Sequence, residues 1–149
     1  MPAAGAALTG LACAAVALSA CTSAVAVSPA PRASSAACAA ASRHWPATVG
    51  NQPAVDTSSS SRAVHAWGDP AIIARCGVDP PGPTTEDCVA VDDVDWIAHP
   101  LSDGTRFTTY GRSPAVEVLV PRAYDPPGLL LPAFTAAARA IRQGGQHCR

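Results

Sequence analysis

Four consecutive residues, Leu18-Ser19-Ala20-Cys21, end an uncharged N-terminal segment and have the pattern of a bacterial lipobox. Small side chains before the cysteine let a signal peptidase reach the peptide bond, and the cysteine sulfur then takes the lipid. The segment Ala3 to Ala20 has no charged residue and the length of the apolar part of a signal peptide. The sequence therefore predicts a signal peptide over residues 1–20 and lipid attachment at Cys21.

Two alternatives to a lipid anchor stay open, namely plain secretion after cleavage and a retained membrane-spanning helix. The segment nearly reaches the roughly 18 apolar residues of a membrane span, but it is rich in alanine, which transfers poorly into lipid. Two or three acyl chains anchor a protein stably where one chain does not. We therefore expect an extracytoplasmic domain that is anchored in the cell membrane by lipid.

Four of the six cysteines remain for disulfides once the predicted signal peptide and the lipidated residue are set aside: Cys38, Cys76, Cys88 and Cys148. An even number in an exported domain of this size indicates two disulfides. Three pairings are possible. We favour Cys76–Cys88, which would close a loop rich in proline and glycine, and Cys38–Cys148, which would tie the two ends of the domain together.

Metal, cofactor and nucleic-acid sites find little support in the sequence. The cysteines and histidines do not form the closely spaced pairs that zinc sites use, so we expect no metal site and no cofactor. The formal net charge of −1 gives no electrostatic reason to expect nucleic acid as a partner. None of the common local motifs of hydrolases or nucleotide-binding proteins occurs, although catalytic groups need not be close in sequence.

Aromatic and arginine residues are the candidate ligand-binding groups. Trp67, Trp96 and Tyr110 lie on predicted strands, where they could form a floor for a ligand or pack in the core. A chain with so few aromatic residues more often uses them as core. Arg75 and Arg112 could donate paired hydrogen bonds to a carboxylate or a phosphate. The candidate binding set is therefore Trp67, Arg75, Trp96 and Arg112.

Three acidic residues are the only plausible acids for a hydrolase or transferase that acts on cell-wall material: Asp69, Asp95 and Glu117. Asp69 lies between a glycine and a proline, which is more typical of a turn than of a general base. We therefore name no catalytic residue, and an enzymatic function stays the less favoured hypothesis.

The elements that would position these residues are mostly strands, flanked by two helices. Alternating or β-branched segments predict strands at 64–67, 71–76, 89–91, 94–98, 106–110 and 115–120. Ser34 or Ser35 can cap a short helix that runs to Arg43 and contains Cys38. A second helix is expected from about Pro132 until the Gly144-Gly145 pair.

Composition divides the chain into three parts. After the signal peptide, residues 21–35 are rich in serine, alanine, proline and valine without periodicity, which predicts a flexible, lipid-anchored tether. Residues 36–149 fit a single domain. The expected fold class is α+β: a small antiparallel sheet packed on one face by an N-terminal and a C-terminal helix, with two disulfides.

An ordered set of short motifs carries a resemblance to a known family. The motifs are Ala66-Trp67-Gly68-Asp69-Pro70, Arg75-Cys76-Gly77, Asp95-Trp96, Phe107-Thr108-Thr109-Tyr110-Gly111-Arg112 and Val116-Glu117-Val118. Together they resemble the domain of unknown function 3515 family of exported proteins from high-GC Gram-positive bacteria, over roughly Cys38 to Cys148. The resemblance implies an exported, single-domain protein. It implies no activity and no catalytic residue.

These observations favour a cell-envelope lipoprotein that is not an enzyme. We expect it to bind an envelope protein or a small envelope ligand on the sheet face that the helices leave open. The alternatives are a hydrolase or transferase of cell-wall material, and a structural or assembly role in which the fold only positions the tether.

Overall fold

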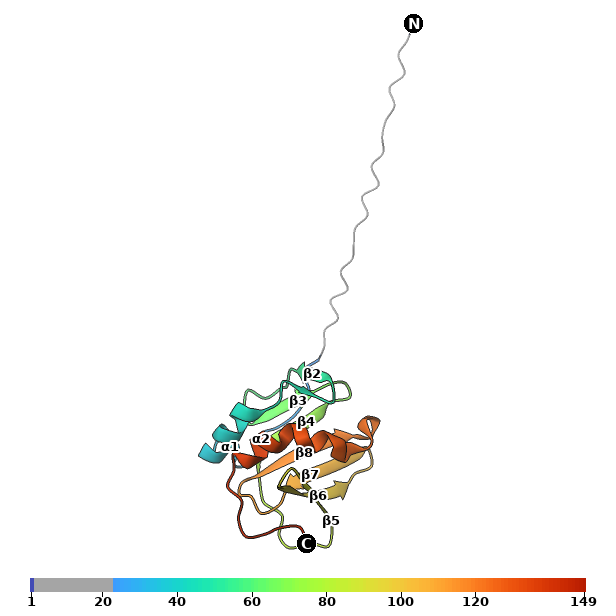
Figure 1. Ribbon diagram of the computed structural model, residues 1–149. Helices are drawn as coiled ribbons and strands as arrows, with labels where there is room; N and C mark the ends of the chain where they lie inside the picture. The colour runs from blue at the N-terminus through green and yellow to red at the C-terminus, as the bar shows by residue number, and fades with distance from the viewer. Residues whose placement is uncertain (2–22) are drawn as a thin grey trace.

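One antiparallel sheet of eight strands forms the centre of the molecule (Figure 1). The computed structural model describes residue 1 and residues 23–149, so Cys21 and the predicted signal peptide lie outside the described residues. The α+β class, the antiparallel pairing and the two disulfides are confirmed. The expectation of a small sheet is wrong, because additional strands extend it at one edge.

The strands follow the order β1-β2-β3-β4-β8-β7-β6-β5. Their bounds are β1 Thr48–Val49, β2 Gln52–Val55, β3 Val64–Trp67, β4 Ile72–Val78, β5 Asp87–Val91, β6 Val94–Pro100, β7 Gly104–Thr109 and β8 Ala115–Pro121. Every strand from β3 onward lies where alternation of apolar side chains predicts one. The strands β5 to β8 form a meander, and β8 returns to pair with β4.

Helical segments precede and follow the sheet in the chain. The first comprises α1 (Ala36–Ala41) and η1 (Ser42–His44), and the Ser35 hydroxyl caps it by accepting from the Cys38 amide at 3.2 Å. The second comprises η2 (Arg122–Tyr124), η3 (Pro127–Phe134) and α2 (Thr135–Arg139). Pro132 lacks an amide hydrogen, so an α-helix begins only after η3. None of the helices among the described residues has the length and hydropathy of a membrane span.

The hydrophobic core lies between these helical segments and one face of the sheet. Alternate side chains of β4 and β8 enter it, including Ala74, Cys76, Val116 and Val118, none of which has exposed surface. Large side chains from the strands and the helical segments fill the space between: Trp67, Trp96, Leu131, Phe134 and Ile141. In Figure 1, α1 and α2 lie across the near side of the sheet, over this face.

The predicted disulfide pairing is wrong: the bridges are Cys38–Cys76 and Cys88–Cys148. Cys76 pairs with Val116 and faces the core, whereas Cys88 pairs with Ile97 and faces the opposite side of the sheet. The strands β8, β7 and β6 also lie between β4 and β5, so the axes of β4 and β5 are about 19 Å apart. A disulfide needs Cα atoms about 4.4–6.8 Å apart, so Cys76 and Cys88 cannot meet.

The folded domain begins before the predicted boundary at residue 36. The Val25 amide donates to the Asp56 carbonyl at 2.8 Å, and the Ser58 amide donates to the Val25 carbonyl at 2.9 Å. Further along, the Arg32 amide donates to the Gly77 carbonyl at 3.0 Å. Polar backbone groups of this segment are satisfied by the domain, so the stretch from Val25 to Ser35 is part of it and not a free tether.

Peptide mapping under non-reducing conditions will test the pairing. Trypsin leaves Cys76 and Cys88 on one peptide, residues 76–106, and cleavage after Glu86 then separates them. We expect residues 33–43 to be linked to 76–86, and residues 143–149 to be linked to 87–106. A linked pair of 76–86 with 87–106 would contradict the strand order described above.

The pH dependence of stability will test the burial of His65. Its ring packs against Trp67 in a tilted arrangement with centroids 4.7 Å apart, and burial lowers the pKa of His65 from its ordinary value of 6.5. The unfolded chain therefore binds this proton more readily than the folded chain, so the free energy of unfolding falls as pH drops below about 6.5. In urea titrations, the free energy of unfolding should fall less between pH 7.5 and pH 5.0 for His65→Gln than for the wild type. His44 is exposed, so His44→Gln is the matched control and should show the same fall in the free energy of unfolding as the wild type.

Candidate functional site on the open sheet face

The side of the sheet opposite the core carries a row of side chains from its central strands. We call this side the open face. Register places Arg75 of β4 beside Glu117 of β8, Glu117 beside Thr108 of β7, and Thr108 beside Ile97 of β6. Because successive side chains of a strand point to opposite faces, these four residues alternate with core residues and point away from the helices.

An ion pair lies at one end of this row, between the central strands β4 and β8 of the sheet. Arg75 Nε donates to Glu117 Oε1 at 2.6 Å, and the two side chains are 31% and 8% exposed. A carboxylate this deeply buried needs a charged partner, because transfer from water disfavours its ionised form. Glu117 is thus paired and is not a free acid.

A hollow of about 260 Å³ opens beside the ion pair. Register places Arg106 of β7 beside His99 of β6 on the open face, and both line the hollow together with Thr108 and Glu117. His99 Nδ1 is in close contact with Glu86 Oε1 from the loop before β5. The Arg106 guanidinium makes no hydrogen bond or ion pair among the described residues.

A second hollow, of about 760 Å³, adjoins the first. It lies between the loop that precedes β5 and the C-terminal tail, which we define as residues 143–149. Tyr110 contributes to its lining. Glu86 and Ile97 line both hollows, so the two form one recess along the open face.

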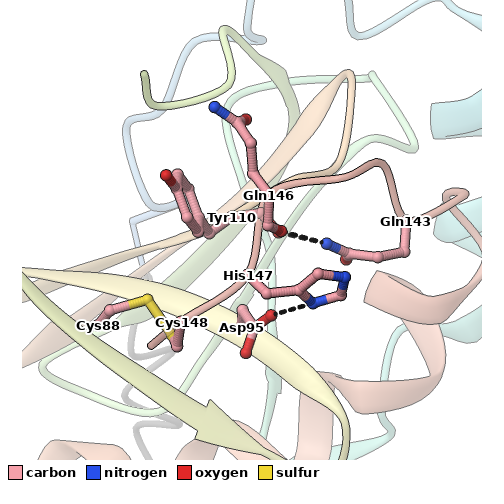
Figure 2. Close-up of polar contacts among 7 residues, drawn as sticks. All are labelled: Cys88, Asp95, Tyr110, Gln143, Gln146, His147 and Cys148. Atoms are coloured by element: carbon pink, nitrogen blue, oxygen red, sulfur yellow. Dashed lines mark hydrogen bonds and ion pairs between the residues drawn. A yellow bond between two sulfur atoms is a disulfide. The ribbon is translucent and has the colours of Figure 1, made fainter. Parts of the chain in front are cut away.

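The C-terminal tail is held to the sheet at several points (Figure 2). His147 Nδ1 lies 2.9 Å from Asp95 Oδ2, and Asp95 is only 8% exposed. The next residue forms the Cys88–Cys148 disulfide. The Gln143 side-chain amide donates to the Gln146 carbonyl at 2.7 Å, which turns the tail back on itself. These contacts make the tail a wall of the larger hollow.

Most of the predicted binding residues do not lie at this recess. Trp67 and Trp96 have no exposed surface and pack in the core, which was the favoured of the two interpretations, so neither belongs to a binding floor. Arg112 is 5% exposed and donates to the Ile141 carbonyl. Burial lowers the pKa of Arg112, the charge of Arg139 lowers it further, and Asp95 opposes the shift. Of the predicted set, only Arg75 lies on the open face.

The predicted acids separate into two kinds. Asp69 is exposed in the turn between β3 and β4, as its flanking residues indicate. Asp95 and Glu117 both lie on the open face, and each already has a partner, His147 and Arg75. Neither His147 nor the other paired imidazole, that of His99, has a hydroxyl or thiol within hydrogen-bonding distance among the described residues. The arrangement of nucleophile, base and orienting acid is therefore not formed there.

Four residues of the recess were missed from the sequence: Arg106, His99, Glu86 and His147. A signal existed for Arg106, because Arg106, Thr108 and Tyr110 alternate along the predicted strand 106–110 and so share a face. His99 lies just beyond the predicted strand 94–98 and joins the recess because β6 continues to Pro100. Glu86 and His147 belong to a loop and a tail that come from distant parts of the chain. The part of the chain that the structure describes contains no cluster of three or more metal-ligating side chains.

Removing one partner of the central ion pair should cost more than removing both charges. Arg75→Ala leaves the buried Glu117 carboxylate unpaired, so we expect the free energy of unfolding to fall by about 2 kcal/mol. Adding Glu117→Gln to Arg75→Ala should recover part of that loss. Urea unfolding of both variants measures the difference, and the exposed Arg43→Ala is the matched control. A double variant less stable than Arg75→Ala would contradict the ion-pair assignment.

Comparison with known proteins agrees with the motif resemblance. The family model described as "Protein of unknown function (DUF3515)" matches residues 2–143. No curated protein and no solved structure shows significant similarity to the chain. Since the match covers nearly the whole sequence, the chain belongs to the DUF3515 family.

Proposed function

We propose that this protein is a cell-envelope lipoprotein that binds an envelope partner or small envelope ligand in the recess of its open face. In this proposal Cys21 carries the lipid and anchors the domain to the outer face of the cytoplasmic membrane. The domain acts as a non-enzymatic binding or accessory module.

Two independent features support the compartment. The Leu18-Ser19-Ala20-Cys21 motif supports lipidation, and the disulfides Cys38–Cys76 and Cys88–Cys148 are typical of proteins that fold in an oxidising environment. The two features are also consistent with each other, since the four cysteines after Cys21 all form disulfides and none is left to pair with Cys21.

The observation that carries the binding proposal is the convergence of the family motifs on the recess. The motifs are spread over more than forty residues of sequence, yet three of their polar or aromatic side chains, Thr108, Tyr110 and Glu117, line the recess. Arg75 and Asp95 lie on the same open face outside the lining of the recess. Recesses with a few convergent polar groups are the usual form of ligand sites. Binding therefore accounts for these residues better than packing alone does.

One arrangement favours the alternative of a hydrolase or transferase of cell-wall material. The Asp95–His147 pair has the geometry of an acid that orients an imidazole base. A nucleophile or activated water would have to come from the ligand side of the recess. Asp95→Asn would abolish such an activity, whereas simple binding in the other part of the recess would persist.

The anchor can be tested by one cysteine substitution. In cells that make the full chain, Cys21→Ala should move the protein from the membrane fraction to the medium or the wall fraction. Cys13→Ala is the matched control, because it lies in the same N-terminal segment, and should leave the protein in the membrane fraction. Intact mass should show acyl chains on a mature protein that begins at Cys21. A protein that still begins at Met1 and carries no acyl chain on Cys21 would overturn the proposed anchor.

The binding surface can be tested by crosslinking in intact cells. A photoreactive residue at Thr108, in the recess, should give reproducible adducts with an envelope component. The same residue at Leu129, which is 74% exposed outside the recess, should not give those adducts. Adducts at neither position, or the same adducts at both, would contradict a ligand site on the open face.

A further inference from the structure

We infer that the smaller hollow, around Arg106, binds a carboxylate group of the ligand. This inference rests on the proposed function and names the chemistry of its site. Arg106 lies in the interior of β7, is partly buried, and lines the hollow with its side chain. Among the described residues no hydrogen bond or ion pair satisfies its guanidinium.

The acidic residues that line the hollow are each paired with a residue other than Arg106. Glu117 is paired with Arg75 at 2.6 Å. Glu86 contacts the His99 imidazole, and Asp79 lies 3.8 Å from Arg32 and is largely exposed. Among the residues that the structure describes, Arg106 is therefore the cation of the hollow that has no partner. No nitrogen of Arg106 is among the buried atoms that lack a partner, so its guanidinium is open to solvent and can donate to an incoming anion.

The charges around the hollow favour a carboxylate over a phosphate. A guanidinium donates two parallel hydrogen bonds to either group. A phosphate monoester brings about −1.5 to −2 charges at neutral pH, and its second charge would meet Glu86, Glu117 and Asp79. A carboxylate brings only the one charge that Arg106 can match. The Thr108 hydroxyl, two residues along the same face of β7, can donate a further hydrogen bond.

The size of the hollow indicates an end group and not a whole ligand. About 260 Å³ is below the volume of roughly 300–1,000 Å³ that drug-sized ligands occupy. The larger hollow joins it along Glu86 and Ile97, so a longer molecule can place its carboxylate at Arg106 and extend toward Tyr110. A small free carboxylate and the carboxyl terminus of a peptide both have this chemistry.

A titration of the full chain with matched probes tests the inference. The probes are acetate, N-acetyl-alanyl-alanine, the C-terminal amide of that dipeptide, and inorganic phosphate, with nuclear magnetic resonance shifts of Ile97 and Thr108 as the readout. We expect saturable shifts with the dipeptide acid and none with its amide. Acetate that binds as tightly as the dipeptide would identify a small free carboxylate, and tighter binding of the dipeptide would identify a peptide end.

Substitution of Arg106 completes the test. Arg106→Gln should weaken binding of the carboxylate probe by about tenfold or more, and Arg106→Lys, which keeps the charge but loses the paired donors, should weaken it less. Arg43→Gln, which changes an exposed arginine of η1, is the matched control and should bind normally. Thermal unfolding of each variant confirms that it is folded.

Three results would overturn the inference: equal binding of the acid and the amide, phosphate binding at least as tight as that of the carboxylate, or normal binding by a folded Arg106→Gln variant. If no carboxylate probe binds but Thr108 still gives specific crosslinks in cells, the inference fails and the proposed function stands. If Thr108 gives no crosslinks, the proposed function fails as well.

Discussion

The pairing of β4 with β8 is the interaction on which the rest of the structure depends. It joins the β3–β4 hairpin to the β5–β8 meander and so makes one sheet from two local units. The same register places Cys76 toward the core and sets Arg75 beside Glu117 on the other side. A slip of one residue would exchange the two faces of β4 and bury the guanidinium in the core. Core, disulfide and open-face charges are thus fixed by one alignment.

Each face of the sheet has its own covalent constraint. Cys38–Cys76 ties α1 to β4 on the core face, and Cys88–Cys148 ties the C-terminal tail to β5 on the open face. The N-terminal segment reaches the sheet at a bulge, where Gly77 has φ of +111° and a Cβ would overlap the backbone of Arg32 and Ala33. Glycine is required there because the segment passes against the strand itself. The recess is therefore bounded by distant parts of the chain that the sheet brings together.

Local patterns in the sequence predicted the local parts of the fold. Alternation located the strands from β3 onward, and Ser35 indicated the start of α1. The β1–β2 hairpin was missed although Gly50-Asn51, both at positive φ, are typical of its turn, because the flanking strands are too short to show alternation. The disulfide partners and the unpaired Arg106 were not predictable for a different reason. They depend on strand order and on which face each side chain takes, and both arise from pairings between distant segments.

The contact of Val25 with residues 56–58 limits how the domain can sit on a surface. Val25 comes only four positions after Cys21, and four steps along the chain span at most about 14 Å even when fully extended. If Cys21 carries the proposed lipid, the strip around Val25 and Thr57 would lie close to the headgroups of the bilayer, and the domain would have little freedom to tumble. Such a short linker would hold the recess at a fixed distance from the bilayer and in a fixed orientation. Only partners within the same thin layer beside the membrane would then reach it.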